Sequence, residues 1–169
     1  ILFGNGDGTF NQTTKDVVVG VSPIFITPGD LDGNQTVDLV TTNFESNNLT
    51  VLSGSGDGTF GPLNTYPAGK GTHWIASGDF NLDGNIDLVT ANIDATNISS
   101  LSGNGDGSFK LPEIYEIQAT VHAVTPGDLN NDGVLDLVTA NISSNTITLL
   151  HGKGDGAFSI RDEYFVGPS

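Results

Sequence analysis

An acidic stretch recurs three times at a constant spacing, and this repeat constrains the fold more than any other feature of the sequence. The copies read GDLDGNQTVDLV, GDFNLDGNIDLV and GDLNNDGVLDLV, and they begin 49 residues apart, at Gly29, Gly78 and Gly127. A fixed period of this length indicates one supersecondary unit copied in tandem. The chain is therefore expected to be a repeat array.

Each copy places acidic and amide side chains at positions 1, 3, 5 and 9 of a short loop. Clustered carboxylates repel one another unless a counter-charge lies among them. Oxygens at this spacing converge on one point, with a backbone carbonyl near position 7, in the manner of a calcium-binding loop. The sequence therefore predicts three Ca²⁺ sites, formed by Asp30, Asp32, Asn34 and Asp38, by Asp79, Asn81, Asp83 and Asp87, and by Asp128, Asn130, Asp132 and Asp136.

The charge balance supports this view of the loops and excludes some partners. The chain has 20 Asp and Glu against 5 Lys and Arg, a formal net charge of −15. Nine of the acidic residues lie in the three loops, so three divalent cations would bring the formal charge to −9. The basic surface of a nucleic-acid-binding protein is missing, and the apolar runs are far shorter than the roughly 18 residues of a membrane span. We expect neither a nucleic-acid partner nor a membrane span.

Each 49-residue unit is expected to form four strands. In the second unit, the segments 73–80, 87–93, 97–103 and 113–118 have the composition of short strands. Helix is disfavoured because Gly is abundant, at 23 residues, and no window keeps apolar residues at helical spacing. Repeated four-stranded units of about 40 to 50 residues indicate the antiparallel blades of an all-β propeller.

A second motif joins the third and fourth strands and occurs four times, as GNGDGTF, GSGDGTF, GNGDGSF and GKGDGAF. Gly and Asp tolerate the positive φ angles of tight hairpin turns, so the motif predicts a turn. The Phe that follows each turn is expected in the core: Phe10, Phe60, Phe109 and Phe158. In an alternative interpretation, the motif's aspartates supplement a calcium site: Asp7, Asp57, Asp106 and Asp155.

The combination of GD[LF][DN], the acidic loop, DLVT and GDG[TSA]F resembles the FG-GAP or VCBS-type repeat, the family that includes the propeller head of integrin α subunits. The resemblance covers essentially the whole chain. It implies that each acidic loop joins the first and second strands of a blade and holds calcium. It also implies that the backbone carbonyls at position 7 are ligands, namely those of Thr36, Asn85 and Val134.

The first loop departs from the family pattern. Position 6 is usually Gly, as in Gly84 and Gly133, but the first loop has Gln35 there and Gly33 two residues earlier. A non-Gly residue at a sharp turn needs left-handed geometry at some cost. The first site is therefore the least certain and is expected to bind most weakly, unless Gly33 takes the turn and Gln35 keeps ordinary dihedrals.

Two other interpretations of the loops stay open. An EF-hand would need Glu at position 12 and helical flanks, but that position is Thr41, Thr90 or Thr139 and the flanks resemble strands. Alternatively, the loops are Asp/Asn-rich turns satisfied by their own backbone, without metal.

A catalytic role is not expected. His73 and His122 occupy equivalent positions 49 residues apart, which copying explains better than a shared site. The chain has no Cys, and no Ser-centred nucleophile motif accompanies the histidines. The sequence therefore offers no catalytic constellation, and we do not expect an enzyme.

The repeat divides the chain into a half blade with third and fourth strands and three full blades, at 1–20, 21–69, 70–118 and 119–169. Propellers close with about four to eight blades, so we expect a partial propeller, completed by further blades of a longer chain or by assembled copies. The expected function is a calcium-binding module, extracellular or at the cell surface, for adhesion or for binding a protein or glycan ligand. The alternatives are a structural section of a surface fibre or large adhesin, and a non-catalytic accessory domain of a polysaccharide-active enzyme. Five glycosylation sequons occur, at Asn11, Asn34, Asn48, Asn97 and Asn141.

Overall fold

Three four-stranded antiparallel sheets make up the computed structural model, which describes residues 1–11 and 16–167. In each sheet the strands follow one another in chain order. We call the first sheet blade 1; it consists of β1 (Pro23–Gly29), β2 (Asp38–Asn43), β3 (Asn48–Gly54) and β4 (Phe60–Pro67). Blade 2 consists of β5 (Thr72–Gly78), β6 (Asp87–Asn92), β7 (Asn97–Leu101) and β8 (Glu113–Glu116). Blade 3 consists of β9 (Val121–Gly127), β10 (Asp136–Asn141), β11 (Thr146–Gly152) and β12 (Phe158–Phe165). The predicted all-β fold and the four strands of each blade are confirmed.

Residues 12–15 of the expected half blade and residues 168–169 of the last blade lie outside the described residues. Over residues 1–11, Gly4 and Phe10 form an isolated antiparallel bridge across the GDG turn. No helix able to cross a membrane is found in the part of the chain that the structure describes.

The hydrophobic core lies between the blades, and blade 2, which lies between the other two, is covered on both faces. The second strand of blade 2 illustrates this, since all six residues of β6 are buried. One cluster joins blades 1 and 2 and includes Leu31, Val40, Leu49, Val51, Ile75, Leu88, Leu101 and Phe109. The other joins blades 2 and 3 and includes Phe80, Val89, Ile98, Val124, Leu137, Leu150 and Phe158.

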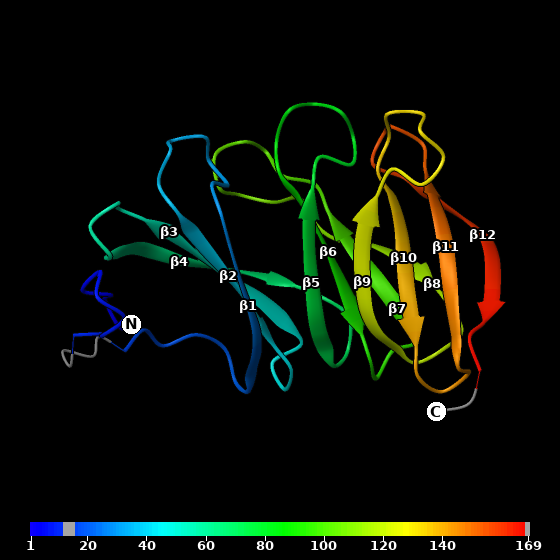
Figure 1. Ribbon diagram of the computed structural model, residues 1–169, viewed down its shortest axis with the longest axis horizontal. Coiled ribbons are helices and arrows are strands. Elements are labelled where there is room, and N and C mark those ends of the chain that lie inside the picture. Colours follow the sequence, from blue (N-terminus) through cyan, green and yellow to red (C-terminus); the bar gives the residue numbers. More distant parts are fainter. Residues whose placement is uncertain (12–15, 168–169) are drawn as a thin grey trace.

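The packing of the blades brings equivalent elements to the same end of the molecule. The first strands β1, β5 and β9 are neighbours, and the loops that follow them lie together at the upper end in Figure 1. Every acidic loop connects the first strand of a blade to the second, as the repeat predicts. The fold therefore presents three acidic loops on one side.

The Phe residues that follow the GDG turns differ in burial according to their neighbours. Phe109 and Phe158 are buried, as expected, and Phe60 is half-buried. Phe10 is exposed, so its expected place in the core is wrong. The reason is that a Phe in this position is buried by the preceding blade, and no described sheet precedes Phe10.

Candidate metal centre

The last aspartate of each acidic loop ties the loop to two strands. In the first loop, residues 30–38, the buried Asp38 begins β2. Its Oδ2 accepts the Leu31 N–H at 2.8 Å and its Oδ1 accepts the Gly54 N–H at 2.7 Å. Asp87 accepts the corresponding N–H groups of Phe80 at 2.9 Å and Gly103 at 2.8 Å. Asp136 accepts those of Leu129 at 3.1 Å and Gly152 at 3.0 Å. Position 9 therefore fixes the loop against the end of the third strand.

Glycine is required at this junction because two backbones approach closely. A Cβ on Gly54 would lie 2.0 Å from the carbonyl oxygen of Val37, which is shorter than any real contact. The same clash would occur at the equivalent glycines, with the Ile86 oxygen at 2.2 Å from Gly103 and the Leu135 oxygen at 2.3 Å from Gly152. The GDG motif thus begins with a glycine that lets the third strand reach the acidic loop.

The first aspartate of each loop accepts hydrogen bonds from the backbone across the turn. Asp30 Oδ1 accepts the Asn34 N–H at 3.1 Å, and Asp30 Oδ2 accepts the Gln35 N–H at 2.9 Å. Asp79 and Asp128 repeat this pattern, with distances from 2.9 to 3.2 Å. These bonds hold position 1 on the inner side of the loop.

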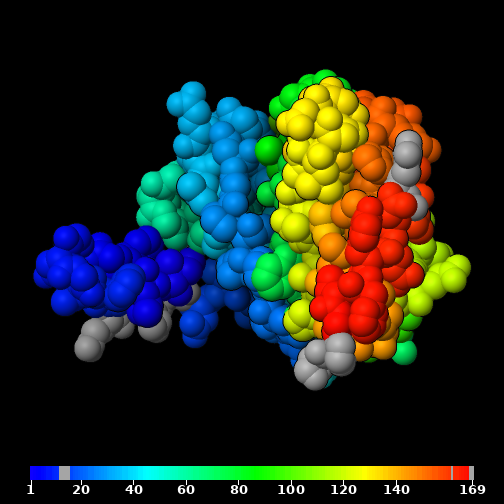
Figure 2. All heavy atoms as spheres, turned by 45° about the vertical axis from the view of Figure 1, so that its right-hand side comes forward, coloured from blue at the N-terminus to red at the C-terminus, as the bar shows by residue number. Residues whose placement is uncertain are grey.

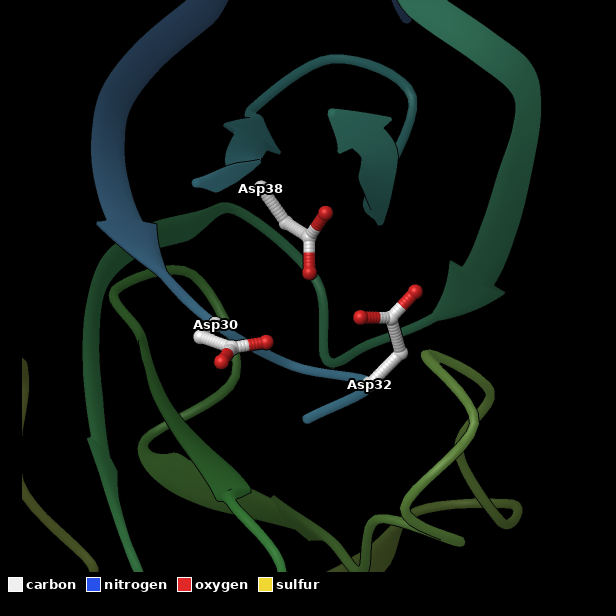
Figure 3. A group of neighbouring side chains, drawn as sticks. All are labelled: Asp30, Asp32 and Asp38. Carbon is white, nitrogen blue, oxygen red and sulfur yellow. The ribbon is translucent and has the colours of Figure 1, made fainter. Parts of the chain in front are cut away.

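Three carboxylates converge in the first loop. Asp30, Asp32 and Asp38 each offer one oxygen, and the three oxygens lie within 4.8 Å of one another. Figure 3 shows these side chains directed into one space, two from the loop and one from the start of β2. Among the described residues, no Lys or Arg forms an ion pair with any of them. Hard oxygen ligands without a basic partner suit a divalent cation such as Ca²⁺.

The other two loops, residues 79–87 and 128–136, do not bring three carboxylates this close among the described residues. Position 3 is Asn81 or Asn130 there, so the third carboxylate must come from position 5. Asp83 and Asp132 at position 5 instead accept the backbone N–H of the residue at position 7, both at 2.8 Å. Of the three predicted sites, one has the geometry of a metal site and two stay predictions, as do the carbonyl ligands at Thr36, Asn85 and Val134.

The carboxylates of the second loop also differ in acidity. Burial raises the pKa of Asp87 above its usual value, against the two backbone N–H bonds that it accepts. The Asn85 N–H lowers the pKa of Asp83, which is fully exposed. A cation near both would favour the ionised form of each.

Gln35 adopts left-handed backbone geometry, with φ of 67°. The alternative in which Gly33 takes the whole turn is therefore wrong, because both residues have positive φ. The premise of a uniquely strained first loop is also wrong, since Leu82 and Asn131 at position 4 of the other loops have φ of 59°. Each loop has one glycine and one non-glycine residue with positive φ, at positions 4 and 6. The glycine is at position 4 in the first loop and at position 6 in the other two.

The FG-GAP-like repeat family matches residues 30–90 and 79–139, which together span more than half of the chain. The chain belongs to this family. A comparison with curated proteins found no match. A solved structure of a lectin from Agrocybe aegerita, reported for its specific recognition of non-reducing terminal N-acetylglucosamine, is similar over 98% of this chain, with a TM-score of 0.61 and 19% sequence identity. The match covers 46% of the lectin chain, so this FG-GAP chain spans less than half of its length while sharing its β-propeller-like fold.

One residue beside an FG-GAP loop was not anticipated from the sequence. His151 Nδ1 lies 3.4 Å from Asp136 Oδ1 and 3.2 Å from Asn130 Nδ2, at the third loop. The equivalent residues in the first two repeats are Ser53 and Ser102. Aligning the three repeats at the residue before the junction glycine would have revealed this difference.

The GDG turns of the FG-GAP repeats have the hydrogen bonds of turns. In each, the aspartate accepts the N–H of the residue two positions later, at 2.9 to 3.0 Å. The turn of one blade also lies beside the acidic loop of the preceding blade, because a Cβ on Gly107 would be 3.6 Å from the Asp32 Cβ. The turn interpretation is confirmed, and a ligand role for the turn aspartates stays a prediction.

His73 and His122 lie side by side on β5 and β9, with ring centroids 4.6 Å apart. Both occupy irregularities in the pairing of the first and second strands, where Ile24 stands in blade 1. The Nδ1 atom of each ring is buried, and within the described residues it has no hydrogen-bond partner. The equivalent placement agrees with an origin by copying of the FG-GAP unit.

Proposed function

We propose that this chain is a calcium-stabilised extracellular module that binds a protein or glycan ligand and has no catalytic chemistry of its own. The observation that carries the proposal is the convergence of Asp30, Asp32 and Asp38 within 4.8 Å, without a basic partner among the described residues. Three like charges at this distance repel one another, and a bound divalent cation turns that repulsion into attraction.

Calcium suits this loop better than magnesium. The loop offers carboxylates, an amide side chain and a backbone carbonyl, and Ca²⁺ accepts six to eight such oxygens in flexible geometry. Mg²⁺ requires a tighter octahedral shell and retains its waters. Asp30 is exposed and Asp32 is half-buried, so we expect an affinity in the extracellular class, with Kd of about 10⁻⁴ to 10⁻³ M.

We extend the proposal to the second and third loops because they share the backbone hydrogen bonds of the first. Their position 1 aspartates accept the corresponding turn N–H groups, and their position 9 aspartates accept the N–H of position 2 and the N–H of the junction glycine. At position 3, an amide oxygen of Asn81 or Asn130 replaces a carboxylate. Three bound divalent ions would reduce the formal charge of −15 to −9.

The support for ligand binding is the shared fold and the position of the loops. Loops held by a rigid β scaffold are the usual place for binding residues, and the three acidic loops lie at one end of the blades (Figure 1). The lectin that shares this fold recognises a glycan. A glycan ligand is therefore the first to test, with a protein ligand second.

Calorimetric titration of the chelated protein with Ca²⁺ tests the metal, and up to three sites are expected. A glycan array probed with the labelled protein in calcium and in chelator tests the ligand. The absence of any calcium binding would refute the proposed stabilisation. Calcium binding without any retained glycan would leave a stabilised module and remove the glycan from the proposal.

A further inference from the structure

Two imidazole rings stack where blades 2 and 3 meet. His73 of β5 and His122 of β9 have ring centroids 4.6 Å apart and an interplanar angle of 39°. Figure 1 shows β5 and β9 side by side. In Figure 2, part of blade 2, in green, is seen between blade 1, in blue, and blade 3, in yellow to red. The stacked rings therefore belong to a contact between blades and not to a single sheet.

The surroundings of the two rings favour their neutral form. The Nδ1 atom of each ring is buried, and it has no hydrogen-bond partner among the described residues. This arrangement fits the tautomer that carries its proton on Nε2. A proton added at Nδ1 would create a charged N–H donor without an acceptor, and a buried donor that stays unpaired is costly. The folded contact therefore opposes protonation of either ring at Nδ1.

The stacking of the rings opposes protonation of both at once. Two imidazolium rings at a centroid distance of 4.6 Å would place like charges close together, which disfavours the charged form. The repeat does not require an ionisable ring at this position, because Ile24 stands there in blade 1. Within the described residues, the pair is thus confined to the contact between blades 2 and 3.

The strands that pack on β5 and β9 bring no charged side chain to this end of the described sheets. β1 has none, and the single charged residue of β2, β6 or β10 pairs with the glycine at the far end of the first strand: Asp38, Asp87 and Asp136. In the connecting segments, Lys70 precedes β5 and Asp94 lies beside Gly71. Lys70 and Asp94 are exposed and opposite in charge, and residues 117–120 before β9 have no charge.

His73 also connects this contact to blade 1. Its backbone carbonyl accepts the Thr42 hydroxyl of β2 at 3.0 Å. The next residue, Trp74, stacks on Phe25 of β1 with ring centroids 4.4 Å apart. Trp74 also packs against the apolar cluster between blades 2 and 3. A change at the two rings therefore affects a strand that contacts both neighbouring blades.

We propose that His73 and His122 form a pH-sensitive contact that weakens the junction of blades 2 and 3 in acid. An unfolded chain gains a proton on each His as the pH falls through about 6.5. The folded chain gains fewer, because the buried Nδ1 atoms and the stacked rings oppose the charge. The unfolded state then binds more protons, so the free energy of unfolding decreases as the pH falls. This inference depends on neither calcium nor a ligand.

Single variants of the 169-residue protein test the pair. His73→Ile and His122→Ile each replace one ring by the residue that blade 1 has at this position, Ile24. His151→Ser is the matched control, because His151 is the third of three His residues, and the equivalents in the first two repeats are Ser. All proteins are measured in chelator, so that metal binding does not contribute.

Urea unfolding between about pH 7.5 and about pH 5.5 is the measurement. It is followed by the fluorescence of Trp74, the one Trp of the chain. Each proton that only the unfolded chain binds raises the unfolding equilibrium constant by up to about tenfold per pH unit. Over this range, the constant of the wild type is expected to rise about tenfold more than that of either Ile variant. The carboxylates are the same in all of these proteins, so their effect cancels.

The wild type and His151→Ser are expected to behave alike. Ile variants whose unfolding constants follow the wild type at every pH would overturn the proposal. So would a His151→Ser protein that loses the additional rise, because the effect would then arise at the third acidic loop. Where an Ile variant does not fold, His122→Phe retains a flat ring for the stack without a titratable group. A His122→Phe protein that keeps the full acid dependence would also overturn the proposal.

Discussion

Replacing Asp32 with Asn tests the calcium site through a change in sign. Asp32 Oδ1 accepts the Asn34 N–H at 3.1 Å and Oδ2 accepts the Asn34 amide at 2.9 Å, both local bonds of an incompletely buried side chain. The substitution removes one of three charges that lie within 4.8 Å and leaves the side-chain volume nearly unchanged. Without metal, loss of repulsion is expected to leave the protein as stable as the wild type or more stable, by up to about 1 kcal/mol.

With calcium the effect is expected to reverse. An ion that binds only the folded state stabilises it by RT ln(1 + [L]/Kd), about 2.7 kcal/mol at a hundredfold excess over Kd. A tenfold loss of affinity removes about 1.4 kcal/mol at saturation. For a chain of this size, that corresponds to a fall in Tm of roughly 3 to 6 °C.

Differential scanning calorimetry in calcium and in chelator measures both arms. Asp94→Asn is the matched control, because Asp94 is an exposed residue between β6 and β7 and its loss changes the net charge equally. The control is expected to respond alike in the two buffers. An Asp32→Asn protein that loses the same stability in chelator as in calcium would refute a metal role for Asp32. The carboxylate would then serve only to stabilise the turn.

Three further predictions concern the loop backbone and the contacts between blades. Gln35→Gly is expected to raise stability in chelator by about 1 kcal/mol, because Gln35 has a φ of 67°; no gain in a denaturant titration would contradict this strain. Gly54→Ala is expected to cost about 1 to 3 kcal/mol or more, because its Cβ would lie 2.0 Å from the Val37 oxygen, and an unchanged melting curve would rule out the close approach. Burial, followed by a hydrogen bond to Glu113, raises the pKa of Tyr115 from 10.0 to about 12. The folded pKa exceeds the unfolded value, so the contribution of Tyr115 to the free energy of unfolding is complete below pH 10 and is lost as the pH rises through about 12. An ultraviolet titration of Tyr115→Phe should lack the phenol ionisation step near pH 12. If that step persists in the variant, it belongs to another group.

The repeat in the sequence was sufficient to predict the local structure. A period of 49 residues with strand-forming segments predicted four strands per unit, and the strand expected at 73–80 lies at Thr72–Gly78. The DLVT segments became the second strands, and the acidic loops connect first to second strands. Local chain geometry depends on the residues of one unit, and those residues are nearly the same in each copy.

The arrangement of side chains in the loops depended on bonds that the spacing does not reveal. Positions 1, 3, 5 and 9 are oxygen-bearing in all three loops, but only Asp30, Asp32 and Asp38 converge among the described residues. The difference follows from which residue occupies position 3 and which backbone N–H each carboxylate accepts. The sequence left two alternatives for the backbone at Gln35, and it gave no sign of the left-handed residue at Leu82.

Burial was decided by the tertiary structure alone. Phe80 and Leu129 occupy equivalent positions, as do Phe109 and Phe10, yet one member of each pair is buried and the other exposed. The sequence determined which residues are apolar and which face of a blade they share. The burial of that face depends on a sheet some 49 residues away in the chain, because a blade has no core of its own and is stabilised only where a second blade covers it.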